Sequence, residues 1–345
     1  MKICVFLLGC SLFASTALAQ PQTKVVKLAS TTPAEQKAIL AQVGDGTLNQ
    51  IEHVVDKGEI TFDVDMTTKD GEDRDFTIAW DGTLMSVEVS LKDTPDAVQR
   101  AIRSQLGAGK LDTIEKSIDD DEISYDVTSI AKDGQDRSFT VSDSGKLLSL
   151  EITLAEAPTL VQKAIASEVG QNQLGNIEKN LEDGDVTYQV SFTNKAGLPR
   201  SFTLGDEGKV ESREIALEDA PPAVQQTVAT EVGKGKVQDV DEIIDSDGIT
   251  YEIGMTVNAN GGRYRDFTVA ADGHLDSREV ALANAPAPVR AAIAAQIGNG
   301  KVLSIEQSFV EKEAGVFPYQ VTAEKDGKPF DFSVGPKGRF LGMDD

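Results

Sequence analysis

The sequence predicts an α+β fold of five tandem repeats, each one helix packed on a four-stranded antiparallel meander sheet. Two observations lead to this prediction. First, a fixed period recurs: Gln36, Gln99, Gln162, Gln225 and Arg290 follow one another at steps of 63, 63, 63 and 65 residues, and self-similarity at one period is typical of repeat architectures. Second, the spacing of apolar residues within each period changes from 3.6 to 2, which indicates a helix followed by strands.

The second copy shows the helical part clearly. Val98, Ile102 and Leu106 lie on one helical stripe, and Gly107 follows directly. Glycine ends helices because it accepts a left-handed backbone. This pattern predicts a helix from about Thr94 to Leu106.

After the helix, apolar and polar residues alternate. Ile123, Tyr125 and Val127 are interleaved with polar residues, which predicts a strand with one dry face and one polar face. Neighbouring strands are expected at about 111–118, 137–141 and 146–154, separated by turns that contain acidic residues or glycine.

These elements set the expected division of the chain. The predicted segments are a signal peptide at 1–19 and repeats at 25–90, 91–153, 154–216, 217–281 and 282–345.

The first residues read as a targeting segment. Lys2 supplies the positive start, an apolar run follows, and Ala17-Leu18-Ala19 gives a small-residue cleavage pattern. We expect cleavage after Ala19 and a soluble periplasmic or secreted bacterial protein. Lipid attachment at Cys10 is the less favoured alternative. The chain's two cysteines, Cys4 and Cys10, both lie in this segment, so no disulfide or cysteine metal site is expected.

The composition is strongly acidic, with 57 Asp and Glu against 33 Lys and Arg and a net charge of −24. Nucleic acids and anionic membranes require clustered basic residues, so both are excluded as expected partners. The charge suits solubility and a basic partner.

Nothing in the sequence predicts an enzyme. The Gly-x-Gly-Lys run at Gly107–Lys110 lies between a helix and a strand, the wrong order for a phosphate loop. The two histidines, His53 and His274, stand at positions where the other copies carry exposed-type residues. We expect no catalytic residue, no metal site and no cofactor, while weak cation binding at acidic turns stays open.

A recurrent arginine and glutamate are more informative. Arginine stands two residues before the phenylalanine of the third strand, and glutamate follows fourteen residues after that arginine. The pairs are Arg74 and Glu88, Arg137 and Glu151, Arg200 and Glu214, and Arg265 and Glu279. The favoured reading is a cross-strand ion pair at the rim of each core, and the alternative is a recurrent binding site.

The polar strand positions are the candidate binding residues. In the second copy they are Ser124, Asp126 and Thr128, and in the third Thr187, Gln189 and Ser191. A broad polar sheet face suits a protein surface better than a small molecule, which prefers a concave apolar pocket. Trp80, the one tryptophan, is a further candidate contact because it lies in a turn and has no equivalent in the other copies. The alternative, weighted equally, is a lone exposed aromatic without a partner role.

The order of these elements resembles the PepSY domain family, in particular the tandem PepSY-like group related in fold to beta-lactamase-inhibitor protein. The resemblance rests on the helix ending in glycine, on Ile114-Glu115, on Tyr125-x-Val127, and on a glycine hairpin near Phe139-Thr140-Val141. It implies an exported, non-enzymatic module, and some relatives restrain peptidases. The leading hypothesis is therefore a protein-binding array, with inhibition of a peptidase or other hydrolase as one form of it. The alternative is an acidic envelope protein that sequesters cations or small ligands.

Overall fold

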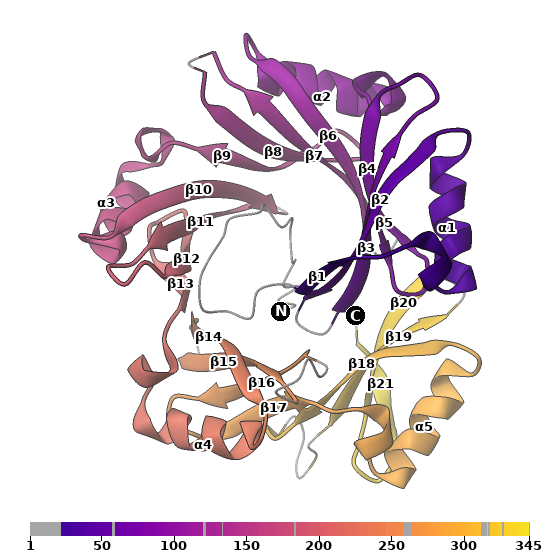
Figure 1. The fold of residues 1–345 in the computed structure, drawn as a ribbon. Helices are drawn as coiled ribbons and strands as arrows, with labels where there is room; N and C mark the ends of the chain where they lie inside the picture. Colours follow the sequence, from indigo (N-terminus) through magenta and orange to yellow (C-terminus); the bar gives the residue numbers. More distant parts are fainter. Residues whose placement is uncertain are drawn as a thin grey trace. The chain divides into compact units, whose positions relative to one another are not determined.

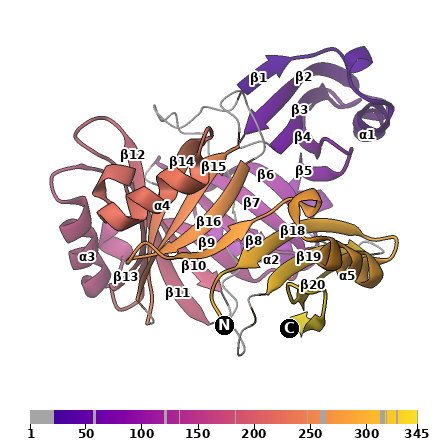
Figure 2. The same ribbon diagram turned by 90° about the horizontal axis from the view of Figure 1, so that it is seen from below.

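The computed structural model describes residues 22–56, 59–119, 122–132, 134–182, 184–246, 248–257, 264–311, 316, 318–325 and 328–344. The predicted signal peptide, its cleavage after Ala19 and the alternative at Cys10 lie outside these residues. The described chain contains five α-helices and 21 strands, shown in two views in Figures 1 and 2. It divides into two compact units: the first contains most of repeats 1 to 3 and ends at Lys209, and the second contains the chain from Val210 onward, including β13 of repeat 3.

Each helix contains 11 residues and is followed by a glycine. Helices α1 to α5 span Pro33–Val43, Asp96–Leu106, Thr159–Val169, Pro222–Val232 and Ala287–Ile297. Short 3₁₀ turns precede them at Leu28–Ser30, Leu91–Asp93, Leu154–Glu156, Leu217–Asp219 and Leu282–Asn284. The helix predicted in the second copy is confirmed, although it begins at Asp96 because Leu91–Asp93 forms the 3₁₀ turn. Gly107 has a φ of 51°, as the stop signal requires.

The strands follow the helices in a constant order. Repeat 1 contains β2 (Thr47–Asp56), β3 (Glu59–Thr67), β4 (Asp73–Ala79) and β5 (Leu84–Glu88). Repeat 2 contains β6 (Lys110–Asp119), β7 (Glu122–Ile130), β8 (Asp136–Ser142) and β9 (Leu147–Ile152). Repeat 3 contains β10 (Gln173–Glu182), β11 (Asp185–Thr193), β12 (Pro199–Gly205) and β13 (Val210–Glu214).

The last two repeats use the same order. Repeat 4 contains β14 (Lys236–Ile244), β15 (Ile249–Thr256), β16 (Tyr264–Ala270) and β17 (Leu275–Glu279). Repeat 5 contains β18 (Lys301–Ser308), β19 (Tyr319–Lys325), β20 (Lys328–Val334) and β21 (Phe340–Asp344). The four strands expected in the second copy are confirmed to within two residues at each described boundary.

The predicted fold class is nevertheless wrong in its architecture. Five separate four-stranded sheets were expected, whereas the strands form one 21-stranded antiparallel sheet. The reason is that the fourth strand of one repeat pairs with the first strand of the next, as β5 does with β6 and β9 with β10. Pairing satisfies the backbone groups that a separate sheet would leave open at its edges.

A further strand, β1 (Gln22–Val25), was not predicted. It pairs antiparallel with β2, with Thr23 opposite Val54 and Val25 opposite Glu52. The first strand of repeat 1 therefore also has a neighbour on its outer side.

Each helix packs on the dry face of its own strands. In repeat 2, Val98 and Ile102 of α2 are fully buried against Ile114, Val127 and Val141. The turn between β8 and β9 holds the start of this helix, because a Cβ on Gly145 would come within 2.8 Å of the Ala97 carbonyl oxygen. Comparable cores lie in repeats 1, 4 and 5.

Candidate binding face

The face of the sheet opposite the helices is polar, and we call it the polar face. Tyr125 and Val127 are buried under α2, so their neighbours Ser124, Asp126 and Thr128 lie on the polar face. In the same way Tyr188 and Val190 are buried, which places Thr187, Gln189 and Ser191 on that face. The structure thus brings the six predicted strand residues to one side of the sheet within one unit.

At least three of these six side chains are already engaged with neighbours. Asp126 accepts hydrogen bonds from Thr140 Oγ1 at 2.7 Å and from Ser117 Oγ at 2.9 Å. Thr128 contacts Thr113 through their hydroxyls at 2.6 Å. In repeat 3, Ser191 Oγ accepts a hydrogen bond from the Asn176 backbone at 2.8 Å. These contacts rigidify the surface, which lowers the entropy cost of presenting it to a partner.

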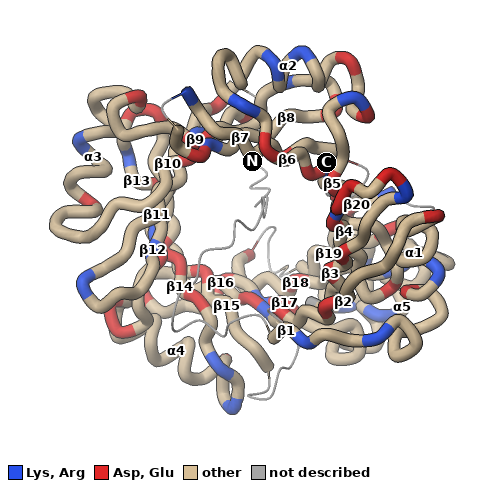
Figure 3. Tube along the Cα trace, turned by 45° about the horizontal axis from the view of Figure 1, so that its top comes forward, with Lys and Arg blue, Asp and Glu red and all other residues tan. Residues whose placement is uncertain are grey.

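Carboxylates face one another at every junction between repeats. The opposed pairs, which we call the junction carboxylates, are Glu88 and Glu115, Glu151 and Glu178, Glu214 and Asp241, and Glu279 and Glu306. They lie on the polar face, because Ile114, the residue before Glu115, is buried in the core. Like charges directly opposite each other destabilise a sheet, so stability alone does not account for their recurrence. Figure 3 shows acidic residues along strands as well as in the turns.

In repeat 1 the junction carboxylates extend into a row across four strands. Asp65 on β3 faces Asp75 on β4, and Glu88 on β5 faces Glu115 on β6. Partial burial and repulsion from Asp65 raise the pKa of Asp75. Partial burial and repulsion from Asp75 raise the pKa of Glu88, although the Arg74 charge acts against this. We call Asp65, Asp75, Glu88 and Glu115 the acidic row.

The second unit carries a more buried group of carboxylates around Glu252 on β15. Glu252 faces Asp241 on β14. Burial first, and then repulsion from Asp266 and Asp241, raises the pKa of Glu252 to about 7. A carboxyl group with such a pKa suits acid–base catalysis, but the two pockets described below are lined by other residues.

A tyrosine, a glycine and an aspartate complete this group, and the sequence reasoning missed them. Tyr264 donates a hydrogen bond to Asp239 Oδ1 at 3.0 Å. The contact passes over Gly254, where a Cβ would come within 2.1 Å of the Tyr264 hydroxyl. Burial and the Asp239 charge raise the pKa of Tyr264. The sequence carries a signal for this contact, because two of these residues differ from their counterparts in the second repeat. Thr128 stands at the position of Gly254, and Asp136 stands at the position of Tyr264.

In repeats 1 and 2 the two arginines form ion pairs with residues other than the predicted glutamates, although the Arg74 charge still acts on the pKa of Glu88. Arg137 contacts Glu156 at 3.1 Å, and Arg74 contacts Asp93 at 3.7 Å. The register explains this. Phe139 faces Leu150, so Glu151, the next residue, lies on the opposite face from Phe139 and Arg137. The four glutamates Glu88, Glu151, Glu214 and Glu279 are instead members of the junction carboxylates.

The remaining two arginines lie at equivalent strand positions. Arg200 faces Phe192 across β11 and β12, and Arg265 faces Met255 across β15 and β16. Phe267 faces Arg278, so Glu279 also lies on the opposite face of the sheet from Arg265.

Trp80 lies in the turn after β4 and is 58% exposed. Its backbone N–H donates to the Ile60 carbonyl at 3.1 Å. An exposed aromatic ring in a turn suits a contact with a partner, and that role stays a prediction.

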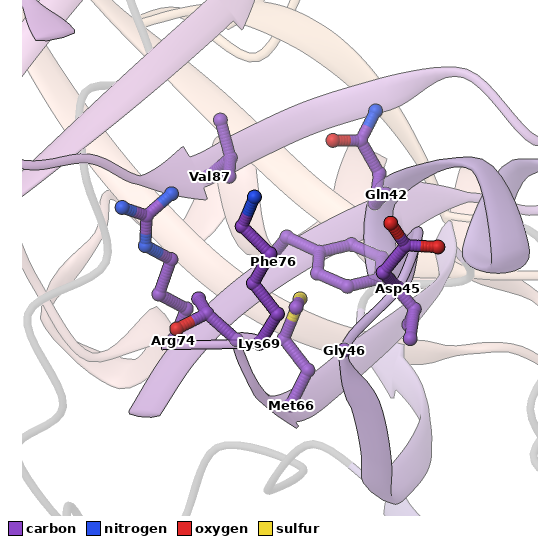
Figure 4. A pocket seen from close by; sticks show the side chains of 10 residues that line it. Gln42, Asp45, Gly46, Met66, Lys69, Arg74, Phe76 and Val87 are labelled. Atoms are coloured by element: carbon purple, nitrogen blue, oxygen red, sulfur yellow. The ribbon is translucent and has the colours of Figure 1, made fainter. Parts of the chain in front are cut away.

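A pocket of about 330 Å³ lies beside the end of α1. Figure 4 shows Lys69 and Arg74 on one side of Phe76, with Gln42 and Asp45 on the other. A second pocket of about 310 Å³ lies in repeat 5, between Val280 and Ile305. Arg74 already contacts Asp93 and Ser90, so neither the charge nor the lining of the first pocket singles out a ligand.

The described residues provide neither a metal site nor a membrane-spanning helix. Within the part of the chain that the structure describes, no group of three or more His, Cys, Asp and Glu residues could hold a metal ion. Among the same described ranges, no helix is long and apolar enough to cross a membrane.

Comparisons with known proteins give only distant likenesses. No family model and no curated protein matches this chain. A candidate calcium-regulated periplasmic protein from Bacteroides thetaiotaomicron is 18% identical, with a TM-score of 0.27, over 39% of this chain and 97% of its own. A periplasmic protein of unknown function from Bacteroides vulgatus is 17% identical, with a TM-score of 0.26, over 36% and 95%. The C-terminal domain of YpeB from Bacillus megaterium is 17% identical, with a TM-score of 0.17, over 55% and 96%.

Proposed function

We propose that this chain is an exported, non-catalytic, PepSY-like binding protein that captures a cationic protein on its polar face. The observation that carries the proposal is the opposition of acidic residues at the junctions, above all the acidic row of Asp65, Asp75, Glu88 and Glu115.

The energetics of the acidic row favour a cationic occupant. Asp75 and Glu88 both have raised pKa values because they are partly buried and repel neighbouring carboxylates. A lysine or arginine placed over the row would relieve this repulsion and form charge-assisted hydrogen bonds. Binding energy is thereby available from charges that are unfavourable in the free protein.

The spacing favours an extended partner over a metal ion. Neighbouring strands lie about 4.8 Å apart, so a row across four strands spreads its carboxylates over more than 10 Å. A calcium ion needs six to eight oxygen ligands at about 2.3–2.6 Å, and the described residues offer no such group. The cation-sequestering alternative therefore receives no specific support.

The export part of the proposal rests on the Ala17-Leu18-Ala19 pattern, and the PepSY-like part on the recurring motifs of the sequence. Inhibition of a peptidase or another hydrolase would be one use of such a face, since a broad rigid surface can cover an active-site entrance.

The direct test measures binding of egg-white lysozyme and a ten-residue lysine peptide, two cationic probes, to the protein without residues 1–19. Glu88→Gln with Glu115→Gln should weaken binding of both probes several-fold. Asp126→Arg with Gln189→Arg should weaken it further, because these changes place positive charge on the polar face. Binding should also fall with ionic strength.

The matched control neutralises two exposed turn residues, Asp70→Asn with Glu207→Gln. It removes two negative charges, as Glu88→Gln with Glu115→Gln does, but leaves the polar face intact. Equal weakening in this control would show that only the overall charge matters, and the proposed face would be wrong. Stoichiometric stabilisation by Ca²⁺ alone would favour the cation-sequestering alternative.

A further inference from the structure

Strand β1 occupies the place of a fourth strand in front of repeat 1. At the first junction, Ser86, Val87 and Glu88 of β5 face Ser117, Lys116 and Glu115 of β6. Thr23, Lys24 and Val25 of β1 face Val54, His53 and Glu52 of β2. Each residue in the second set lies 63 positions before its counterpart in the first, so the two registers are identical.

The contacts that follow the strand are also equivalent. The Val26 N–H donates to the Ile51 carbonyl at 2.9 Å, and the Val89 N–H donates to the Ile114 carbonyl at 2.8 Å. Val26 and Leu28 pack against the core of repeat 1. The edge of β2 is thus built to accept a fourth strand, and β1 fills that site.

The hold of β1 on this site is weak. It has four residues, all of them exposed, and the described chain places no second neighbour beside it. A short edge strand with a free outer side gains little from packing. Val26 and Leu28 would keep the following segment in place if β1 separated from β2.

Strand β21 is the fourth strand of repeat 5, the type of strand that pairs with the first strand of a following repeat at each internal junction. It pairs with β20, and among the described residues no strand pairs with its outer edge. Gly342, Met343 and Asp344 stand where Ser277, Arg278 and Glu279 stand in β17, and β17 uses those residues to pair with β18. Met343 is 55% exposed.

We propose that β21 of one copy pairs with the β2 edge of a second copy, in the place of β1. The register would set Gly342 opposite Val54, Met343 opposite His53 and Asp344 opposite Glu52. Met343 would then meet His53, whose ring already packs edge-on against Phe62 at 5.2 Å.

The register supports this occupant over an unrelated strand. All four internal junctions oppose two acidic residues, whereas β1 sets Val25 opposite Glu52. Pairing β21 with β2 would oppose Asp344 and Glu52 and so reproduce the internal register, at the cost of the same like-charge repulsion. Such a head-to-tail contact is heterologous and yields chains or closed rings of copies. The inference does not depend on the proposed function.

The test mixes two full chains that each carry one engineered cysteine, expressed without residues 1–19 so that Cys4 and Cys10 are absent. One chain has His53→Cys and an affinity tag, and the other has Met343→Cys and no tag. Mild oxidation should give a tagged–untagged disulfide dimer whose yield rises with concentration. Adding Lys24→Pro to the tagged chain should raise the yield several-fold, because proline cannot donate to the strand pairing of β1.

Two controls fix the interpretation. Val54→Cys in place of His53→Cys puts the thiol on the opposite face of β2 and should give a much lower yield. Val87→Cys with Lys116→Cys in one chain shows that this register position permits a disulfide. The disulfide yield of the His53→Cys and Met343→Cys mixture is compared with that of the Val54→Cys control, both with and without Lys24→Pro. If it does not exceed the control yield in either background, the proposal is wrong.

Discussion

Asp126 in repeat 2 and Glu252 in repeat 4 occupy the same position on the polar face, yet their surroundings differ. Asp126 accepts hydrogen bonds from Thr140 and Ser117. Glu252 is set among Asp266, Asp241, Asp239 and Glu306, and its pKa is raised to about 7. The dry face below them is nearly the same in both repeats, with Phe139 and Phe267 buried in matching places.

This difference shows that the repeated sequence places different demands on the two faces of the sheet. The dry face must fill a core under a helix of fixed length, so each repeat meets the same packing demand. The polar face has no such demand, and its chemistry varies from repeat to repeat. The repeats therefore share a scaffold while each presents its own surface.

The largest expected effect on stability tests the dry face, which repeats 2 and 4 share. Phe139→Ala and Phe267→Ala should each lower the free energy of unfolding of their unit by about 3–5 kcal/mol, because each removes a buried ring and leaves a cavity. Urea unfolding followed by circular dichroism measures this. A loss near zero in one repeat and a large loss in the other would contradict a common dry face.

The next effect tests the polar face, where substitutions at Glu252 and Asp126 should change the free energy of unfolding in opposite directions. At pH 8, Glu252→Gln should stabilise its unit by about 1–3 kcal/mol, because it removes a partly buried charge that neighbouring carboxylates repel. Asp126→Asn should destabilise its unit by about 1 kcal/mol, because hydrogen bonds to a charged acceptor are the stronger kind. Changes of the same sign would remove the distinction between the two positions.

The pH dependence of stability sharpens the same contrast. The pKa of Glu252 is raised from 4.5 to about 7 in the folded protein, so the folded state holds this proton more tightly than the unfolded state. Its contribution to stability is greatest below pH 4.5 and is lost as the pH rises towards 7. Unfolding curves from pH 4 to pH 8 should show this loss in the wild type relative to Glu252→Gln. A constant difference between the two proteins over that range would mean that the Glu252 pKa is not raised.

The smallest effect concerns the arginine that the sequence paired with the wrong partner. Arg137→Ala should cost about 0.2–1 kcal/mol, the range for an exposed ion pair, because Arg137 contacts the half-exposed Glu156. The pKa of Glu156 is lowered mainly by a backbone hydrogen bond from Thr153, which the substitution leaves intact. Glu151→Gln should add to Arg137→Ala without interaction between them. A strong rescue by Glu151→Gln would show that Arg137 and Glu151 are coupled after all.

The sequence was sufficient for the elements of repeat 2 and for the assignment of the residues of β7 and β11 to their faces. Helix α2 and strands β6 to β9 follow from local spacing, because periods of 3.6 and 2 report directly on which side of an element is buried. The six candidate residues from Ser124 to Ser191 were placed on the correct face for the same reason.

The sequence was not sufficient for pairing between elements. One sheet of 21 strands requires that β5 pair with β6, and no local pattern states which strand lies beside an edge. The Arg137–Glu151 prediction failed because a register shift between Thr140 and Val141 changes the face on which the residues of β9 lie relative to a simple count. The contact between Tyr264 and Asp239 depends on the absence of a side chain at Gly254, which only a three-dimensional arrangement reveals.

The pairing of each strand with its neighbour in sequence has a kinetic consequence. In the registers described, each pairing joins strands that are consecutive or separated by one helix, so little chain entropy is lost in closing any single loop. Mixed proteins with short-range contacts fold faster than sandwiches that pair distant strands. A chain of this design can fold from one end, each new hairpin adding to an edge that already exists.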